Sequence, residues 1–252
     1  MKKYDCFTFF NEEEMLKIRL HELYYTVEKF LVVEGDLTFT GRPKHFYLDD
    51  ILEKDWIQPF KDKIVRCRVG MGKVALSVGA TSWRTEIYQR NHIKHGLEKL
   101  IQPEPDDLIV ISDADEIPRA YYLGDIHVTC QLDVTQYFWN FNWQVPQHCN
   151  QGARPVVTFW KDLKETTPQE LRESTDLPRL SNMGWHFSFF TDPKETKTKI
   201  EAFAHTEYDK DTYKLPVHTR YRIEHGIDPF DRFPLKWTEI DETYPKYVQE
   251  NY

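Results

Sequence analysis

The chain of 252 residues lacks the sequence features of several large protein classes. No stretch approaches the roughly 18 consecutive apolar residues of a membrane-spanning helix, and the N-terminus has no apolar signal-peptide core. No block of Lys and Arg offsets the net charge of −8, which argues against clustered phosphate contacts. We therefore expect a cytoplasmic protein that has no transmembrane segment and binds no nucleic acid.

Cysteine and glycine motifs are also missing. The four cysteines form no Cys-x-x-Cys pair, and Cys6 and Cys67 lie in apolar strand-like runs, so buried free thiols are expected. Neither G-x-G-x-x-G nor G-x-x-x-x-G-K-[ST] occurs, which argues against a dinucleotide fold and against a P-loop. If the protein binds phosphate, its charge must be neutralised by a metal ion rather than by a glycine cradle.

Aromatic residues are abundant: 16 Phe, 14 Tyr and 7 Trp make up 15% of the chain. Together with a hydrophobic share of 40%, they are sufficient for one sizeable core, and a single domain is expected. Aromatic side chains also stack on sugars and bases, although core packing is their commoner use.

The most informative stretch runs from Leu108 to Pro118, with the sequence LIVISDADEIP. Its four leading apolar residues, three of them β-branched, predict a strand buried on both faces. Carboxylates are unfavourable within such a strand, so Asp113 and Asp115 are expected at its C-terminal end, where open α/β sheets bind ligands. Two carboxylates there suit Mg²⁺ or Mn²⁺, which can hold a diphosphate. A second Asp-x-Asp, at Asp209 and Asp211, follows no hydrophobic run and is interpreted as a solvated turn.

The first half of the chain predicts alternating strands and helices. Strands are expected at residues 4–10, 30–33, 64–69 and 108–111. Helices are expected from residue 11 and from residue 82, and a short one at 47–54. This order predicts a right-handed Rossmann-like half with a mostly parallel sheet.

Local signals predict where the helices of this half begin. Asn11 is expected to cap the first helix and Ser82 the helix that runs to about Lys99. Gly70, Gly72 and Gly79 predict a flexible connection before the second of these helices.

Three further polar residues of the first half are candidates for donor binding. Glu34 follows the second strand and could accept hydrogen bonds from a ribose or a base, or be an ordinary loop acid. Arg84 and Arg90 are the basic residues of the long helix expected to face the carboxylate edge, and an exposed helix face is the alternative.

The second half is richer in aromatic strands. The run Trp139–Val145 alternates aromatic and amide side chains, so a strand with an amide face suited to sugar hydroxyls is predicted, with residues 155–160 as its antiparallel partner. A third strand is expected at 184–190 around His186, which could equally be a structural histidine. A helix is expected at 200–208, with an irregular tail from Tyr213.

These patterns predict one domain in two halves. Residues 1–118 would form the nucleotide-sugar-binding half, and residues 119–252 an antiparallel, aromatic-rich acceptor half with a C-terminal tail.

With these residues in view, the chain resembles glycosyltransferase family 17, which includes N-acetylglucosaminyltransferases acting on N-glycans. The resemblance rests on Tyr4-Asp5-Cys6-Phe7 with Asn11-Glu12, His21-Glu22-Leu23, Val33-Glu34, Asp113 to Pro118 and Gly184 to Ser188. The resemblance implies a GT-A-like fold and metal-dependent transfer with inversion, using Mn²⁺ (or Mg²⁺) and a UDP-sugar donor, UDP-GlcNAc above all. The acceptor would be a glycan or glycolipid, with a β-1,4 link to mannose.

The resemblance also suggests which residues hold the metal ion. Asp115, helped by Asp113, would bind the cation that bridges the diphosphate and stabilises the leaving group. His186 would be a further ligand, because GT-A enzymes often use a histidine late in the chain.

The remaining roles go to other charged residues. Glu34 would contact the uridine, and Arg84 or Arg90 the phosphates. An inverting transfer needs a carboxylate to take the proton of the acceptor hydroxyl, for which Glu116 and Glu207 are both candidates.

Two other functions compete with this one. A haloacid-dehalogenase-like phosphohydrolase also carries Asp-x-Asp after a buried strand, but it has Thr or Val where this chain has Ile117, and its motif lies near the N-terminus. A non-catalytic carbohydrate-binding module would suit the aromatic content, although such modules are not usually built on a βαβ unit with a carboxylate edge.

Overall fold

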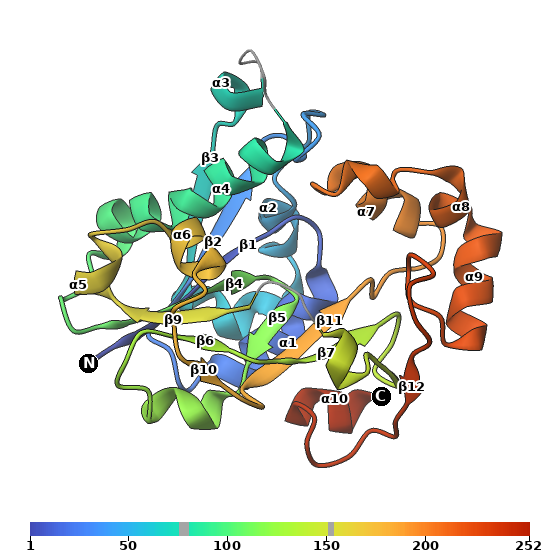
Figure 1. Cartoon of the computed structure of the whole chain (residues 1–252). Helices are drawn as coiled ribbons and strands as arrows, with labels where there is room; N and C mark the ends of the chain where they lie inside the picture. The colour runs from blue at the N-terminus through green and yellow to red at the C-terminus, as the bar shows by residue number, and fades with distance from the viewer. Residues whose placement is uncertain (76–80, 151–153) are drawn as a thin grey trace.

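The computed structural model describes residues 1–75, 81–150 and 154–252, so Gly79 of the expected glycine connection lies outside the described residues. The chain forms a mixed α/β structure with two sheets (Figure 1). One sheet has the strand order β10-β6-β9-β4-β1-β2-β3, and the other has the order β12-β8-β7-β11-β5. No helix in the described part of the chain is both long enough and apolar enough to span a membrane.

The first sheet has a parallel centre, as the sequence predicts. Its strands are β1 (Lys3–Thr8), β2 (Lys29–Gly35), β3 (Ile64–Val69) and β4 (Leu108–Asp113), and each neighbouring pair is parallel. Because β4 pairs with β1 rather than with β3, the strand order reverses between β1 and β4. In Rossmann-like sheets such a reversal opens a crevice at the carboxyl ends of the two strands.

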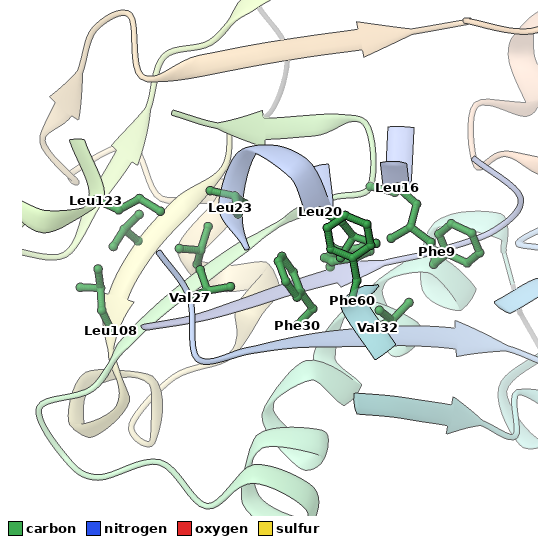
Figure 2. Close-up of a cluster of buried hydrophobic side chains, with 14 of the residues drawn as sticks. Phe9, Leu16, Leu20, Leu23, Val27, Phe30, Val32, Phe60, Leu108 and Leu123 are labelled. Atoms are coloured by element: carbon green, nitrogen blue, oxygen red, sulfur yellow. The ribbon is translucent and has the colours of Figure 1, made fainter. Parts of the chain in front are cut away.

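Helices cover both faces of this parallel centre. One face carries α1 (Glu13–Leu23), α2 (Tyr47–Ile51) and the 3₁₀ helix η1 (Asp55–Lys63), and Figure 2 shows the core between them and the sheet. The other face carries α4 (Ser82–Gly96) and its π-helical continuation η2 (Leu97–Ile101). Successive strand residues such as Leu31 and Val32 are both apolar and point to opposite sides, so both faces of the sheet are apolar.

Two of the predicted helix caps are wrong by one residue. Helix α1 begins after Glu12, and Asn11 forms no cap. Helix α4 is capped by the Thr81 hydroxyl, which accepts from the Arg84 backbone N–H, so Ser82 is the first helical residue. All four cysteines are free thiols, as predicted, and Cys149 alone among them is only partly buried.

The first sheet continues beyond β4 with strands from later in the chain. These are β9 (Val156–Phe159), β6 (Cys130–Leu132) and β10 (Arg179–Leu180), with α5 (Trp160–Leu163) and α6 (Pro168–Glu173) between β9 and β10. The expected pairing of residues 155–160 with 139–145 is wrong, because β9 lies antiparallel between β4 and β6. The proposed division at residue 118 stays a prediction, and these three strands come from beyond it.

The second sheet is mixed rather than antiparallel, which corrects the sequence expectation. It contains β5 (Glu116–Pro118), β7 (Thr135–Phe138), β8 (Trp143–Gln144), β11 (Gly184–Ser188) and β12 (Lys236–Trp237), and β7 runs parallel to β11. Of the predicted strand at 139–145, only Trp143 and Gln144 lie in a strand, which is β8. The chain turns at Trp139, whose φ is 73°, and the Asn140 side chain accepts from the backbone of Asn142 and Trp143.

The C-terminal third is more helical than predicted. Helix α7 (Thr196–Ala202) replaces the expected helix at 200–208, and the expected irregular tail contains α8 (Asp211–Lys214), α9 (Pro216–His225) and α10 (Lys246–Asn251). Figure 1 shows α7, α8 and α9 grouped together on one side of the molecule. The remaining elements are α3 (Gly72–Ala75), η3 (Ala120–Gly124), η4 (Gln147–Cys149) and η5 (Thr206–Tyr208).

Helix α1 lies between the two sheets and is buried on more than one side. Leu16, Leu20 and Leu23 pack against the first sheet, whereas Met15 and Ile18 pack under the second with Trp185 and Phe187 of β11. A helix that is apolar over so wide an arc belongs in an interior. The two sheets therefore meet at α1 and at the short link between β4 and β5.

Candidate active site

The link between the two sheets is the Asp-x-Asp motif itself. Asp113 ends β4 beside Thr8 of β1, Asp115 lies in the following turn, and Glu116 begins β5 of the second sheet. The predicted position of the first carboxylate at the strand end is confirmed. Because the order of strands reverses between β1 and β4, the motif lies at the edge where a ligand would bind.

A buried arginine of α1 fixes the backbone of this link. Arg19 donates to the carbonyl oxygens of Asp113 at 3.0 Å and Glu116 at 2.8 Å, and to the Ser112 hydroxyl. Its other donors bind both carboxylate oxygens of Asp5 at 2.6 Å, in the middle of β1. Asp5 shows that a buried strand does carry a carboxylate when a guanidinium meets it, so the sequence rule was too strict.

Asp113 is held by cations on two helices. It accepts from Arg90 of α4 at 2.9 Å, from Arg172 of α6 at 3.1 Å and from the Thr8 hydroxyl at 2.9 Å. Burial raises the pKa of Asp113, but the two guanidinium groups outweigh burial and hold it well below its usual range. Asp113 is therefore a permanent anion whose oxygens are already in use.

Glu116 belongs to the same buried network. Both of its oxygens accept from Arg172, at 2.6 and 3.1 Å, and Oε2 also accepts from the Asp113 backbone N–H at 2.9 Å. Arg90 is further bound to Glu86 and to Gln169. We call Asp113, Glu116, Arg90 and Arg172 the locked flank, because each charge in it meets an opposite charge within 3.1 Å.

Asp115 has looser surroundings. His186 Nε2 and Lys199 Nζ each lie 3.4 Å from one of its oxygens, which is longer than a good charge-assisted hydrogen bond. Burial raises the pKa of Asp115, yet His186 and Lys199 outweigh it and bring the value to about 2. Asp115 is thus ionised at neutral pH with oxygens that could accept a closer ligand.

His186 reaches Asp115 from the middle of β11. The strand can lie so close to β5 because residue 184 is glycine: a Cβ there would be 2.3 Å from the carbonyl oxygen of Ile117. Burial lowers the pKa of His186, but the neighbouring Asp115 carboxylate outweighs burial and raises it above its ordinary value. The Gly-Trp-His sequence therefore sets the position of the imidazole relative to the motif.

Glu12 is an additional carboxylate near Asp115. It precedes α1, and its Oε2 accepts from the backbone N–H groups of Phe10 and Asn11. Neither of these two donors uses its Oε1. Burial raises the pKa of Glu12, Lys199 lowers it and Asp115 raises it further. We call Asp115, His186, Lys199 and Glu12 the open flank.

Glu34 is buried and bound within the chain. Its oxygens accept from Lys44 Nζ and from the backbone N–H groups of Tyr47 and Leu48, which begin α2. Burial raises the pKa of Glu34, and the Lys44 ammonium opposes that rise. Glu34 thus fixes the segment that follows β2 at the ligand edge.

Arg84 and Glu207 are not brought to the motif. Arg84 is exposed and lines a hollow of about 390 Å³ on α4 with Tyr88 and His92. Glu207 lies in η5, is exposed, and accepts from His205 Nδ1 at 2.8 Å. Burial raises the pKa of Glu207, but His205 outweighs it and lowers the pKa.

The donor set suits a hard divalent cation only in part. Across residues 1–75, 81–150 and 154–252, no three His, Cys, Asp or Glu side chains are grouped as a ready-made metal site. Asp115 and His186 nevertheless supply a carboxylate and an imidazole side by side, and diphosphate oxygens and water could complete the coordination. The residues therefore fit a cation that is shared with an anionic ligand.

Sequence reasoning missed four residues around the motif. They are Arg19, Arg172, Lys199 and Glu12. Arg19 left a signal, since a charged residue lies within the apolar stripe of α1. Arg172 and Lys199 left none, because they lie in polar segments far along the chain.

Comparison with known proteins gives a family match. The family model described as glycosyltransferase family 17 matches residues 1–244. Three curated proteins named beta-1,4-mannosyl-glycoprotein 4-beta-N-acetylglucosaminyltransferase, from Homo sapiens, Rattus norvegicus and Mus musculus, are each 28% identical to this chain over 109 residues. The aligned stretch covers 43% of this chain and 20% of each relative. The match thus spans a fifth of the length of these relatives.

Proposed function

The chain belongs to glycosyltransferase family 17, and we propose that it transfers a sugar, GlcNAc from UDP-GlcNAc, to a glycan hydroxyl with inversion. A GT-A-like arrangement would carry the reaction. The observation that carries the proposal is the placement of Asp113-Ala114-Asp115 at the switch edge of a mostly parallel sheet, with loosely paired charges around Asp115.

The two aspartates would divide the work of the metal site. Asp115 is the proposed ligand of Mn²⁺ or Mg²⁺, with His186 as a further ligand, because both have oxygen or nitrogen atoms free to turn toward a cation. Asp113 would support them by adding negative charge from a fixed position. A bound cation would supply charge stabilisation of the departing diphosphate.

The donor-binding roles follow from where each residue lies. Glu34 would act on the uridine side by holding Lys44 and the start of α2 in place at the end of β2. Arg90 would act by keeping Asp113 fixed and ionised. Arg84 stays a predicted phosphate contact, and its place on the α4 hollow does not favour that role.

The catalytic base can be chosen by testing three carboxylates. Glu116 is bound twice by Arg172, and Glu207 is exposed beside His205, so neither offers a buried free oxygen at the edge. Glu12 combines proximity to Asp115, a raised pKa and an Oε1 that the Phe10 and Asn11 N–H groups do not use, which are the properties a proton acceptor needs. We therefore place Glu12 ahead of Glu116 and Glu207.

The acceptor is inferred from the names of the relatives. They are named for transfer to the mannose of a glycoprotein, so a mannose-containing glycan or glycolipid is proposed for this chain. The second sheet offers aromatic surface on which sugar rings could stack. There the ring centres of Trp143 and the exposed Trp237 lie 4.8 Å apart.

Calorimetric titration tests the function directly. UDP-GlcNAc would be titrated into the protein with Mn²⁺ and, separately, with EDTA. Binding only with Mn²⁺ is expected. Mn²⁺-dependent binding of a different UDP-sugar would keep the mechanism but overturn the donor, and no nucleotide binding at all would favour a carbohydrate-binding module instead.

A further inference from the structure

The cations around the motif differ in how fully they are used. Arg90 and Arg172 together make six hydrogen bonds to Asp113, Glu116, Glu86 and Gln169, at 2.5 to 3.1 Å. Within the described part of the chain, Lys199 makes one ion pair, to Asp115 at 3.4 Å. Its ammonium otherwise lies 5.1 Å from the centre of the Phe189 ring. Lys199 is therefore a cation at this edge that can still take up an anion.

The helix that carries Lys199 is attached at the ligand edge. Helix α7 follows β11 of the second sheet, and its last turn binds the loop after β2: the Thr40 hydroxyl donates to the Glu201 carbonyl at 2.8 Å, and the Phe39 N–H to that of Ala202 at 3.1 Å. The helix thus connects the second sheet to the uridine side of the first. This attachment holds the Lys199 side chain near the carboxyl ends of β1, β2 and β4.

We propose that Lys199 binds the diphosphate of the nucleotide-sugar beside the cation at Asp115. The inference rests on the proposed function. A divalent cation on Asp115 would repel the ammonium that lies 3.4 Å from the same carboxylate, and a diphosphate would attract it. Lysine suits such a change of partner, because its point charge sits on a flexible stem and donates in three directions.

The role in the reaction is electrostatic. The acceptor hydroxyl gives its proton to the proposed base Glu12, and its oxygen forms a bond to the anomeric carbon. The bond from that carbon to the β-phosphate oxygen breaks, and the electron pair stays on the diphosphate. Lys199 neutralises part of that new charge without giving up a proton. The Lys199 ammonium thus neutralises phosphate charge that backbone N–H groups would neutralise in a glycine-rich loop.

The test compares Lys199→Met with Lys197→Met. Lys197 lies on the same helix and pairs loosely with Glu201 at 3.9 Å, so it is the matched control. Calorimetry would measure the affinity for UDP, and for UMP, which lacks the β-phosphate, in the presence of Mn²⁺. We expect Lys199→Met to weaken the affinity for UDP at least about tenfold and the affinity for UMP by less than about twofold. Both affinities should be unchanged in Lys197→Met.

The outcomes separate this inference from the proposed function. If the wild-type protein binds no UDP with Mn²⁺, the proposed function fails first. If it binds UDP and Lys199→Met binds it equally well, or loses UDP and UMP to the same extent, the diphosphate role is overturned. Lys199→Arg, which keeps the charge, should recover part of the affinity, and Lys199→Gln replaces the Met variant should that one not fold.

Discussion

The two carboxylates of one Asp-x-Asp motif have opposite surroundings. Asp113, on the locked flank, accepts hydrogen bonds from Arg90, Arg172 and Thr8. Asp115, on the open flank, has His186 and Lys199 at 3.4 Å and no shorter ion pair among the described residues. Two residues apart in the chain, Asp113 is the more exposed of the two side chains, at 33% against 12% for Asp115, yet it has the closer partners.

This difference separates the carboxylate that stabilises the fold from the one that can bind a ligand. A buried charge that meets several tight partners is costly to disturb and has little capacity left for a ligand. A buried charge with distant partners keeps much of its attraction for a cation that can come closer. The locked flank should therefore control stability, and the open flank should control binding and turnover.

The largest expected effect is on stability, from Arg172→Met. The substitution leaves Glu116 buried without its two-point partner and removes one contact of Asp113. Loss of one member of a buried ion pair costs about 3–5 kcal/mol in the free energy of unfolding. Urea denaturation followed by circular dichroism measures the loss.

Two further variants sharpen that result. Arg220→Met, on an exposed position of α9, should change stability by less than about 0.5 kcal/mol. The double variant Arg172→Met/Glu116→Gln should recover part of the loss, because the side chain left at position 116 without its arginine carries no charge. A loss below about 1 kcal/mol in Arg172→Met would contradict the assignment of this flank as scaffold.

Asp115→Asn should show the reverse pattern. We expect Mn²⁺-dependent transfer from UDP-GlcNAc to fall about a hundredfold or more, because a metal ligand is lost and each 1.4 kcal/mol is worth tenfold in rate. The free energy of unfolding should change by less than about 1 kcal/mol, since the ion pairs of Asp115 are long. Initial rates and urea denaturation on the same preparation measure both.

Two results would contradict the prediction for Asp115→Asn. Retained Mn²⁺-dependent activity in Asp115→Asn would remove Asp115 from the metal site. A stability loss as large as that of Arg172→Met would show that the two flanks do not differ in the way proposed.

The sequence predicted the parallel centre and its carboxylate edge because their signals are local. The apolar runs at Phe30–Val33 and Leu108–Ile111 define buried strands, and the acids after them lie where the strands end. The β1-α1-β2 order then requires a parallel pair. The motif was therefore placed at the correct edge without any knowledge of its partners.

The partners themselves could not be predicted, because they are distant in sequence. Arg172 is 59 residues from Asp113, and Lys199 is 84 residues from Asp115. The alternation at Trp139–Val145 misled for a different reason: Trp139 and Phe141 are buried, but they pack into two separate clusters from a turn rather than from one strand face. Periodicity over a short run does not distinguish these arrangements.

Gly184→Ala tests whether the second sheet sets the geometry of the open flank. The new Cβ would lie 2.3 Å from the Ile117 carbonyl oxygen, so β11 must move away from β5. We expect a loss of about 1–3 kcal/mol in the free energy of unfolding, as for other overpacked sites. Mn²⁺ affinity, measured by calorimetry with UDP present, should fall as well, because His186 moves with the strand. Unchanged Mn²⁺ affinity would remove His186 as a ligand.

The smallest expected effect is the pH dependence that His186 adds to the stability of the metal-free protein. Burial lowers the pKa of His186, but the Asp115 carboxylate outweighs burial and raises it. Glu116 adds to this rise, and Lys199 opposes it. A folded-state pKa above the unfolded value of about 6.5 means that the stabilisation is complete below that pH and is lost as pH rises through the folded value. We expect less than about 1 kcal/mol, measured by urea denaturation in EDTA from about pH 5.5 to about pH 8.5. His186→Gln should remove this slope, whereas identical pH profiles for both proteins would mean that the imidazole does not bear the charge that faces Asp115.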